Sequence, residues 1–266
     1  MNLKRYGNWA MVTGCSTGLG RAFADVLASS GLNCVLVGLE GERLEQFSRE
    51  LVRQYGVECR FREVDLAAEG FLKEVRLITG GIDIDILVNN AGIGCGGNFW
   101  SVDATKAGTL VRLNCLAPVL LTREFLPGMV ERGRGAIVMV ASVMGFISAP
   151  GEAAYNASKA FDLHFGESLW GELRGSLVDV ITVCPAGIRS DFYEREGFSA
   201  PDRKRMRDMS DAPEKIARAT FKYLGRKPVY APPVSGLIGF CARLLPRRVT
   251  TLAVRSLMRK FIRFYR

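Results

Sequence analysis

Short apolar runs rich in valine and isoleucine alternate along this chain with longer segments whose apolar residues recur at helical spacing. This alternation predicts an α/β fold in which a doubly wound parallel sheet is covered by helices on both faces. The runs at 137–141 and 180–183 contain no charged residue, as strands buried on both faces require. Seven strands are expected, at 9–13, 33–38, 57–64, 85–89, 136–141, 178–184 and 229–231. Helices are expected at 18–30, 41–55, 69–78, 103–132, 152–174 and 213–225.

The chain has 266 residues, 48% of them hydrophobic, which is enough to bury a sizeable core. We expect one domain over residues 1–232, because no linker or repeat interrupts the alternation there. A polar stretch at 189–211 has no clear period, and insertions of that length in compact α/β proteins are usually lids or binding loops. Residues 233–266 then form a separate tail.

Charge is concentrated in that tail. The chain carries a formal charge of +9, and residues 235–266 contain eight basic residues and no acidic one. The domain before the tail is therefore close to neutral, and nucleic-acid binding is not indicated.

The seven cysteines are odd in number and widely scattered, which indicates neither a disulfide framework nor a metal site. The first residues lack the pattern of a secretory leader, since 9–13 already reads as a buried strand. No apolar run reaches the length of about 18 residues that a membrane span needs. We therefore expect a cytoplasmic protein that holds no metal.

A glycine-rich turn joins the first expected strand to the first expected helix. Its glycines, Gly14, Gly18 and Gly20, follow the spacing G-x-x-x-G-x-G. Glycines at such a turn let the backbone approach a pyrophosphate, while free N–H groups at the start of the helix face the anion. The turn alone is weak evidence, because the same residues also allow a helix to pack closely on a sheet.

Three polar residues form a second pattern. Tyr155 and Lys159 are four residues apart, so they rise from one face of a helix. A neighbouring ammonium stabilises a phenolate and brings the pKa of the phenol toward the working range of an acid or base. Ser142 follows a buried strand, where α/β sheets place ligands, and its hydroxyl is suited to orienting a substrate carbonyl.

Together these motifs resemble the short-chain dehydrogenase/reductase family. The resemblance spans about residues 8–231 and includes the glycine turn, Asn-Asn-Ala-Gly at 89–92, and Asp65 after the third strand. Asn114, Ser142, Tyr155 and Lys159 match the catalytic tetrad of that family. The resemblance implies a Rossmann fold and an NAD(P)-dependent oxidoreductase, in which Lys159 also binds the nicotinamide ribose and Asn114 holds a water in a proton relay.

The same resemblance implies a set of cofactor contacts along the carboxyl edge of the sheet. After the sixth strand the chain has Ala186 where the family commonly has glycine, so the turn around Pro185 and Gly187 departs from the pattern. The expected contacts are Gly14, Ser16, Gly18, Leu19, Gly20, Asp65, Leu66, Asn90, Ala91, Gly92, Tyr155, Lys159, Pro185, Gly187 and Ile188.

The end of the second strand ordinarily decides between NAD and NADP. An acid there binds the ribose hydroxyls of NAD, whereas an arginine pairs with the NADP phosphate. This chain has Gly38 and Leu39 at those positions. Glu40 and Arg43 follow, and each is equally suited to the surface of the next helix. We expect weak discrimination with a slight preference for NADP, as in related reductases.

Within the family, the N-terminal stretch is similar to long-chain 3-oxoacyl thioester reductases and hydroxysteroid dehydrogenases, whose substrates are bulky and apolar. A matching pocket is expected from side chains after Ser142 and in the 189–211 insertion. The candidates are Met144, Phe146, Ile147, Phe192, Tyr193 and Phe198.

The tail carries an amphipathic helical pattern. Val254, Leu257, Met258, Phe261, Ile262 and Tyr265 form an apolar stripe, and the basic residues of 252–266 occupy the other side. Such a helix either docks on protein, on its own domain or on a second subunit, or binds an anionic membrane surface peripherally.

These features predict an oxidoreductase that interconverts a carbonyl and a secondary alcohol on a hydrophobic substrate. Tyr155 is its expected acid or base. By family resemblance it is a homodimer or homotetramer formed through two long helices. Two rival functions stay open: a dinucleotide-binding sensor or scaffold without catalysis, and a peripheral membrane adaptor that acts through the tail.

Overall fold

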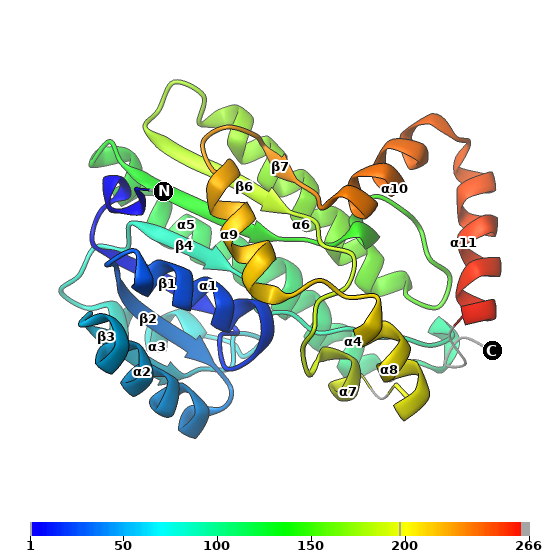
Figure 1. Ribbon diagram of the computed structural model, residues 1–266, viewed down its shortest axis with the longest axis horizontal. Helices are drawn as coiled ribbons and strands as arrows, with labels where there is room; N and C mark the ends of the chain where they lie inside the picture. The colour runs from blue at the N-terminus through cyan, green and yellow to red at the C-terminus, as the bar shows by residue number, and fades with distance from the viewer. Residues whose placement is uncertain (1, 197, 262–266) are drawn as a thin grey trace.

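A single seven-stranded sheet with all strands parallel forms the centre of the protein (Figure 1). The computed structural model describes residues 2–196 and 198–261. The strands match the expected ones in number and type and differ at their ends by at most two residues. They are β1 (Trp9–Thr13), β2 (Asn33–Gly38), β3 (Cys59–Glu63), β4 (Ile86–Asn89), β5 (Gly135–Val140), β6 (Val178–Val183) and β7 (Val229–Tyr230).

The strand order is β3-β2-β1-β4-β5-β6-β7. The chain builds outward from β1 in one direction, then returns to place β4 against the other side of β1. Crossovers on either side of this point run in opposite directions, so a crevice opens beyond the carboxyl ends of β1 and β4. Each residue that follows these two strands therefore lies at the same edge.

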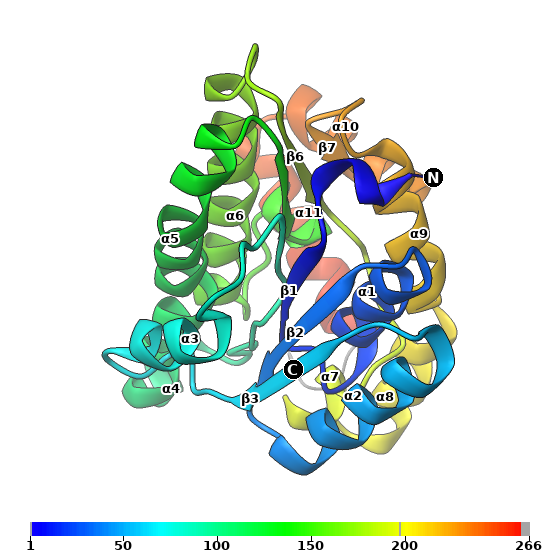
Figure 2. The same ribbon diagram turned by 90° about the vertical axis from the view of Figure 1, so that its left-hand side faces the viewer.

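Helices cover both faces of the sheet, as Figure 2 shows. On one face lie α1 (Gly18–Ser29), α2 (Gly41–Tyr55) and α9 (Pro213–Tyr223), whose apolar sides meet β1 and β2 in one buried cluster. On the other face lie α3 (Phe71–Thr79), α4 (Ala104–Val111), α5 (Ala117–Glu131) and α6 (Ala153–Glu172), with a second cluster beneath α3, α5 and α6. The fold class expected from the alternation is confirmed.

The helix expected at 103–132 is not regular. Between α4 and α5 the chain forms a π-helical turn, Arg112–Leu116. The N–H of Ala117 bonds to the carbonyl of Arg112, five residues back, and Pro118 has no N–H to donate to the carbonyl of Asn114. The wider turn places Asn114 inside the protein, where it is 1% exposed. Such turns are often found at functional sites.

The polar insertion contains two short helices, α7 (Phe192–Arg195) and α8 (Ala200–Asp208). The tail contains α10 (Pro233–Leu244) and α11 (Arg247–Phe261). Gly239 of α10 lies against the ring of Phe146, whereas α11 projects from the domain in Figure 1. Over the residues described, no helix has both the length and the apolar character needed to span a membrane. Ile262 and Tyr265 of the expected tail stripe lie outside the described residues.

Candidate active site

In the glycine turn between β1 and α1, the backbone lies close both to the start of α1 and to the segment after β4. Gly14 and Gly18 have φ of +63° and +58°, in the left-handed region that favours glycine. A Cβ on Gly14 would lie 2.8 Å from the Cα of Ala91, and one on Gly20 would lie 2.3 Å from the carbonyl oxygen of Gly14. Larger residues would therefore force apart the turn, the start of α1 and the segment after β4.

The segment after β4 is tied to this turn. Asn90 donates from its side-chain amide to the carbonyls of Thr13 (2.8 Å) and Gly14 (3.0 Å). The Thr13 hydroxyl accepts from the backbone N–H groups of Asn90 (2.9 Å) and Ala91 (3.0 Å). These bonds hold the two strand ends at a fixed separation across the crevice.

A cleft of about 250 Å³ runs along this edge of the sheet, from the glycine turn to α6. Its glycine-rich floor and the start of α1 fit an extended ligand that carries a phosphate near the helix. Most of the residues expected from the sequence line it. They are Gly14, Ser16, Gly18, Leu19, Asp65, Leu66, Asn90, Ala91, Gly92, Ser142, Tyr155, Lys159, Pro185 and Ile188.

Three expected residues do not line the cleft. Gly20 packs beneath the turn, against Gly14 and Asn90, and Asn114 is buried behind it. Gly187 lies against Ser210 and Tyr193, where a Cβ would be 2.6 Å from the Ser210 hydroxyl. The cleft is lined instead by Ala186, one residue earlier. Gly20 and Gly187 thus make room for neighbouring protein, and their expected contact with a cofactor stays a prediction.

Tyr155 and Ser142 meet at the α6 end of the cleft. Tyr155 is on the first turns of α6, and Ser142 follows β5 with 5% of its surface exposed. Ser142 accepts from the N–H of Met144 at 3.2 Å, and its hydroxyl lies close enough to the phenol to lower the pKa of Tyr155. The ring of Phe192 in α7 lies 5.9 Å from the Tyr155 ring, centroid to centroid. The phenol therefore faces a cleft whose outer wall is the insertion.

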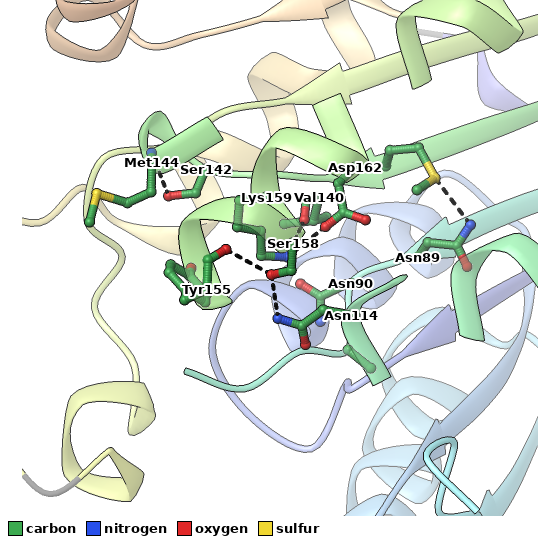
Figure 3. A network of polar contacts seen from close by, with 12 residues as sticks. Asn89, Asn90, Asn114, Val140, Ser142, Met144, Tyr155, Ser158, Lys159 and Asp162 are labelled. Atoms are coloured by element: carbon green, nitrogen blue, oxygen red, sulfur yellow. Dashed lines mark hydrogen bonds and ion pairs between the residues drawn. The ribbon is translucent and has the colours of Figure 1, made fainter. Parts of the chain in front are cut away.

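Lys159 is held by two acceptors. Its Nζ donates to the carbonyl of Val140 and to Oδ2 of Asp162, each at 2.9 Å (Figure 3). Only 6% of the Lys159 side chain and 4% of the Asp162 side chain are exposed. Asp162 was not anticipated, although its position seven residues after Tyr155 puts it on the same helical face as the Tyr-Lys pair.

Burial dominates the charges at this end of the cleft. It raises the pKa of Tyr155, and the nearby carboxylates of Glu152 and Asp162 raise it further. Together these effects outweigh Lys159 and the Ser142 hydroxyl, which lower the pKa. The net shift is thus opposite to the one expected from the pairing alone. Burial also lowers the pKa of Lys159, but the negative charges of Asp162 and Tyr155 reverse this and leave it raised.

Asn114 secures the floor behind the tetrad. Its side-chain amide donates to the carbonyl of Ile93 (2.9 Å) and to the hydroxyl of Ser158 (3.0 Å), and its oxygen accepts from the N–H of Ile93 (3.0 Å). Ser158 in turn donates to the carbonyl of Tyr155 at 2.8 Å. This chain of bonds, drawn in Figure 3, links the π-helical turn to α6.

The opposite end of the cleft contains a more exposed group of charges. Glu40 contacts Arg43 at 3.2 Å and Arg195 of α7 at 3.0 Å. Burial alone would raise the pKa of Glu40, but a hydrogen bond from Ser16 and the two guanidinium groups outweigh it and lower the pKa. Arg43 also approaches Asp191 at 3.6 Å. These contacts join the insertion to the region beyond β2.

The insertion covers the cleft, but only some of the expected apolar residues line it. Phe192 and Tyr193 do so, and Phe198 packs behind Tyr193 with ring centroids 5.5 Å apart. Met144, Phe146 and Ile147 do not line the cleft. Phe146 instead packs against α10, because Gly239 leaves room for its ring.

Glu196 fixes the insertion from the other side. Its carboxylate accepts from the N–H of Gly94 at 2.8 Å and from Lys106 at 3.0 Å. The sequence offered no signal for this contact, since its partners lie about 100 residues earlier in the chain.

Comparison with known proteins agrees with this geometry. Residues 8–197 match the short chain dehydrogenase family. The chain is 34% identical over 183 residues to human very-long-chain 3-oxoacyl-CoA reductase, covering 67% of this chain and 59% of that protein. It is also 34% identical over 203 residues to human inactive hydroxysteroid dehydrogenase-like protein 1, covering 75% and 59%. The matches thus span less than two thirds of these relatives' length.

Solved structures share this fold over most of the chain. A short-chain dehydrogenase from Sphingobium yanoikuyae in complex with NADPH superimposes with a TM-score of 0.79 at 29% identity, covering 89% of this chain and 94% of that one. One from Burkholderia phymatum in complex with NAD gives 0.78 at 25% identity, covering 91% and 94%. The family match over most of the chain, the sheet order and the cleft lead to one conclusion: the chain belongs to the short-chain dehydrogenase/reductase family.

Proposed function

We propose that this protein is an NAD(P)-dependent oxidoreductase that interconverts a carbonyl and a secondary alcohol. One observation carries the proposal: Ser142, Tyr155 and Lys159 converge at one end of a cleft that begins at a glycine turn. A non-catalytic binder gains nothing from a buried ammonium beside a phenol. A close relative named inactive makes a direct test of catalysis essential.

The proposed roles follow from the contacts. A bound nicotinamide ring would supply or accept the hydride. In reduction, Tyr155 gives its proton to the substrate oxygen as that oxygen gains charge, and Ser142 donates a hydrogen bond to the same oxygen. Lys159 stabilises the phenolate left behind, and Asn114 holds α6 through Ser158. Oxidation runs through the same groups in reverse.

The cofactor contacts are the lining residues between Gly14 and Ile188, with Asp65 toward the adenine. We propose weak discrimination between the two nicotinamide cofactors, with a slight preference for NADPH. Arg43 and Arg195 are able to turn toward a phosphate, while Glu40 competes for both. Neighbours solved with NADPH and with NAD support either choice.

The proposed substrate is bulky and apolar, such as a 3-oxoacyl thioester or a steroid. Support comes from the aromatic wall of Phe192 and Tyr193 and from the names of the relatives, a 3-oxoacyl-CoA reductase and a hydroxysteroid dehydrogenase-like protein.

Turnover with a panel of hydrophobic ketones, alcohols and 3-oxoacyl thioesters, each with NADH and NADPH, tests the function. We expect cofactor oxidation or reduction that depends on substrate and is lost in Tyr155→Phe. Binding of cofactor without turnover of any substrate would favour the sensor or scaffold alternative.

We also propose a peripheral contact between the tail and an anionic membrane surface on the cytoplasmic side. Apolar residues of α11 are about half exposed: Val249 at 50%, Leu252 at 51% and Leu257 at 56%. Its exposed arginines, with no acid from 235 onward, complement anionic headgroups. Vesicles containing phosphatidylserine should sediment the full chain but not a 1–234 form, whereas equal sedimentation would exclude a tail anchor.

A homodimer or homotetramer through α5 and α6 is the proposed assembly. Val130 on α5 and Phe161 on α6 are 46% and 40% exposed, so both are accessible to a second subunit. Sedimentation velocity should give a dimer or tetramer, and Phe161→Glu should shift it toward the monomer.

A further inference from the structure

Asp162 is a buried carboxylate that the proposed reaction does not use. It is 3% exposed and follows Tyr155 and Lys159 on the same face of α6, at i+7 and i+3. Its Oδ2 bonds to Lys159 at 2.9 Å. In Figure 3 its other oxygen points away from Lys159.

Among the described residues, Lys159 is the only donor to this carboxylate. Oδ1 has no hydrogen-bond partner in the part of the chain that the structure describes. It borders a small cavity of about 10 Å³, shared with Asn89, whose side-chain oxygen is also unpaired. Within residues 2–196 and 198–261 no second cation or amide bonds to Asp162, so its negative charge acts mainly on Lys159.

Lys159 needs such a partner. A buried ammonium loses its proton readily, and fully buried lysines can have their pKa lowered by as much as about 3–5 units. The groups that face Lys159 are Tyr155 and Asp162 from α6 and Cys115 from the π-helical turn, with Cys184 after β6. The phenol and the thiols are neutral at physiological pH, so Asp162 is the carboxylate that balances the ammonium there.

We propose that Asp162 is a positioning residue of the active site: it keeps Lys159 protonated and fixes its amine between Val140 and the cleft. Lys159 then presents a charged donor to Tyr155 and to the cofactor ribose. The inference rests on the proposed function for its catalytic meaning, but the charge state of Lys159 can be measured without any substrate.

The test is an NMR titration of the full chain labelled with ¹³Cε-lysine, in which Lys159→Met assigns the Lys159 resonance. In the wild-type protein we expect Lys159 to stay protonated beyond the ordinary lysine value of 10.5. In Asp162→Asn it should titrate at least about two pH units lower, since burial then acts on Lys159 without a carboxylate to oppose it. Glu172→Gln removes the same charge from an exposed site on α6 and should leave the titration unchanged.

A measurement of enzymatic activity gives a second test of the role of Asp162. In the oxidative direction, the ratio of kcat/KM for Asp162→Asn to that of the wild type should fall about tenfold between pH 7 and pH 9.5, as Lys159 loses its proton in the variant only. Asp162→Glu should recover part of the loss. A residue with only a structural role would lower kcat/KM equally at every pH.

Three results would overturn the proposal. One is a wild-type Lys159 that titrates below pH 9, which needs no variant to fold. Another is an unchanged Lys159 titration in Asp162→Asn, and the last is a ratio of kcat/KM that does not vary with pH. A wild-type protein without turnover would instead contradict the proposed function, while the NMR titration would still decide the role of Asp162.

Discussion

The two ends of the cleft each join an acid to a base at nearly the same distance, but in different surroundings. Lys159 and Asp162 are 2.9 Å apart, with 6% and 4% of their side chains exposed. Arg195 and Glu40 are 3.0 Å apart, with 50% and 34% exposed. The first pair is adjacent along one helix, and the second joins segments 155 residues apart.

The difference in burial decides what each pair can do. Water and salt screen the Arg195–Glu40 pair, so it stabilises little and can rearrange when a ligand enters. The Lys159–Asp162 pair has lost its hydration, so breaking it leaves an uncompensated charge. The proposed function requires this cleft to admit a cofactor at one end and to control a proton at the other, and both kinds of pair suit that requirement.

The largest expected effect concerns the proton itself. Tyr155→Phe removes the hydroxyl that gives or takes the proton, and general acid–base catalysis contributes about 10²–10⁴-fold to rate. We expect kcat to fall by about 10³-fold, while NADPH affinity, followed by its fluorescence, changes little. Substantial remaining activity would contradict the assignment of Tyr155.

Lys159→Met tests the buried pair through stability. Loss of the ammonium leaves Asp162 without its donor, and removing one partner of a buried pair costs about 3–5 kcal/mol. Urea unfolding should show a loss in this range, and Lys159→Met combined with Asp162→Leu should recover much of it. The matched change at the exposed pair, Arg195→Met, should cost about 1 kcal/mol or less.

The pH dependence of the unfolding free energy should also report on the charge of the buried pair. Because the pKa of Lys159 is raised in the folded protein, its stabilising contribution is fully present below the ordinary lysine value and is lost as pH rises through the raised one. The difference in unfolding free energy between wild type and Lys159→Met should therefore shrink above pH 10.5. A difference that stays constant from pH 8 to 11.5 would contradict a raised pKa.

The smallest effect is expected at the exposed end. Glu40→Gln removes the carboxylate that holds Arg43 and Arg195, so both become available to a phosphate. The ratio of kcat/KM for NADPH to that for NADH should rise by about twofold to fivefold, since an exposed charge pair contributes about 1 kcal/mol or less. Glu45→Gln, on the solvent side of α2, serves as the control, and an equal rise there would remove Glu40 from the explanation.

Much of the fold and of the candidate site could be predicted, because it depends on patterns of neighbouring residues along the sequence. The runs at 137–141 and 180–183, which form most of β5 and β6, contain no charged residue, as strands buried on both faces require. Gly14 and Gly18 mark a turn because their backbone needs positive φ. The i, i+4 spacing of Tyr155 and Lys159 sets their common face in any helix.

The surroundings of other residues could not be predicted, because they depend on side chains that are distant in the sequence but close in space. Gly20 and Gly187 are as small as the glycines that line the cleft, and only packing shows how closely neighbouring protein atoms approach them. Phe146 is apolar like Phe192, yet its ring packs against Gly239 of α10 and does not line the cleft. The helical pattern places Asp162 on the same face as Tyr155 and Lys159, but it does not show that this face is buried.

The sequence by itself determined the order of strands and helices, the glycine turn and the residues of the tetrad, because these depend on periodicity and spacing along the chain. Only the tertiary structure decided the charge balance of the site. The pKa of Tyr155 rises instead of falling because burial by its neighbours outweighs the ammonium of Lys159 and the hydroxyl of Ser142. Desolvation depends on every neighbour in space, and no local pattern specifies them.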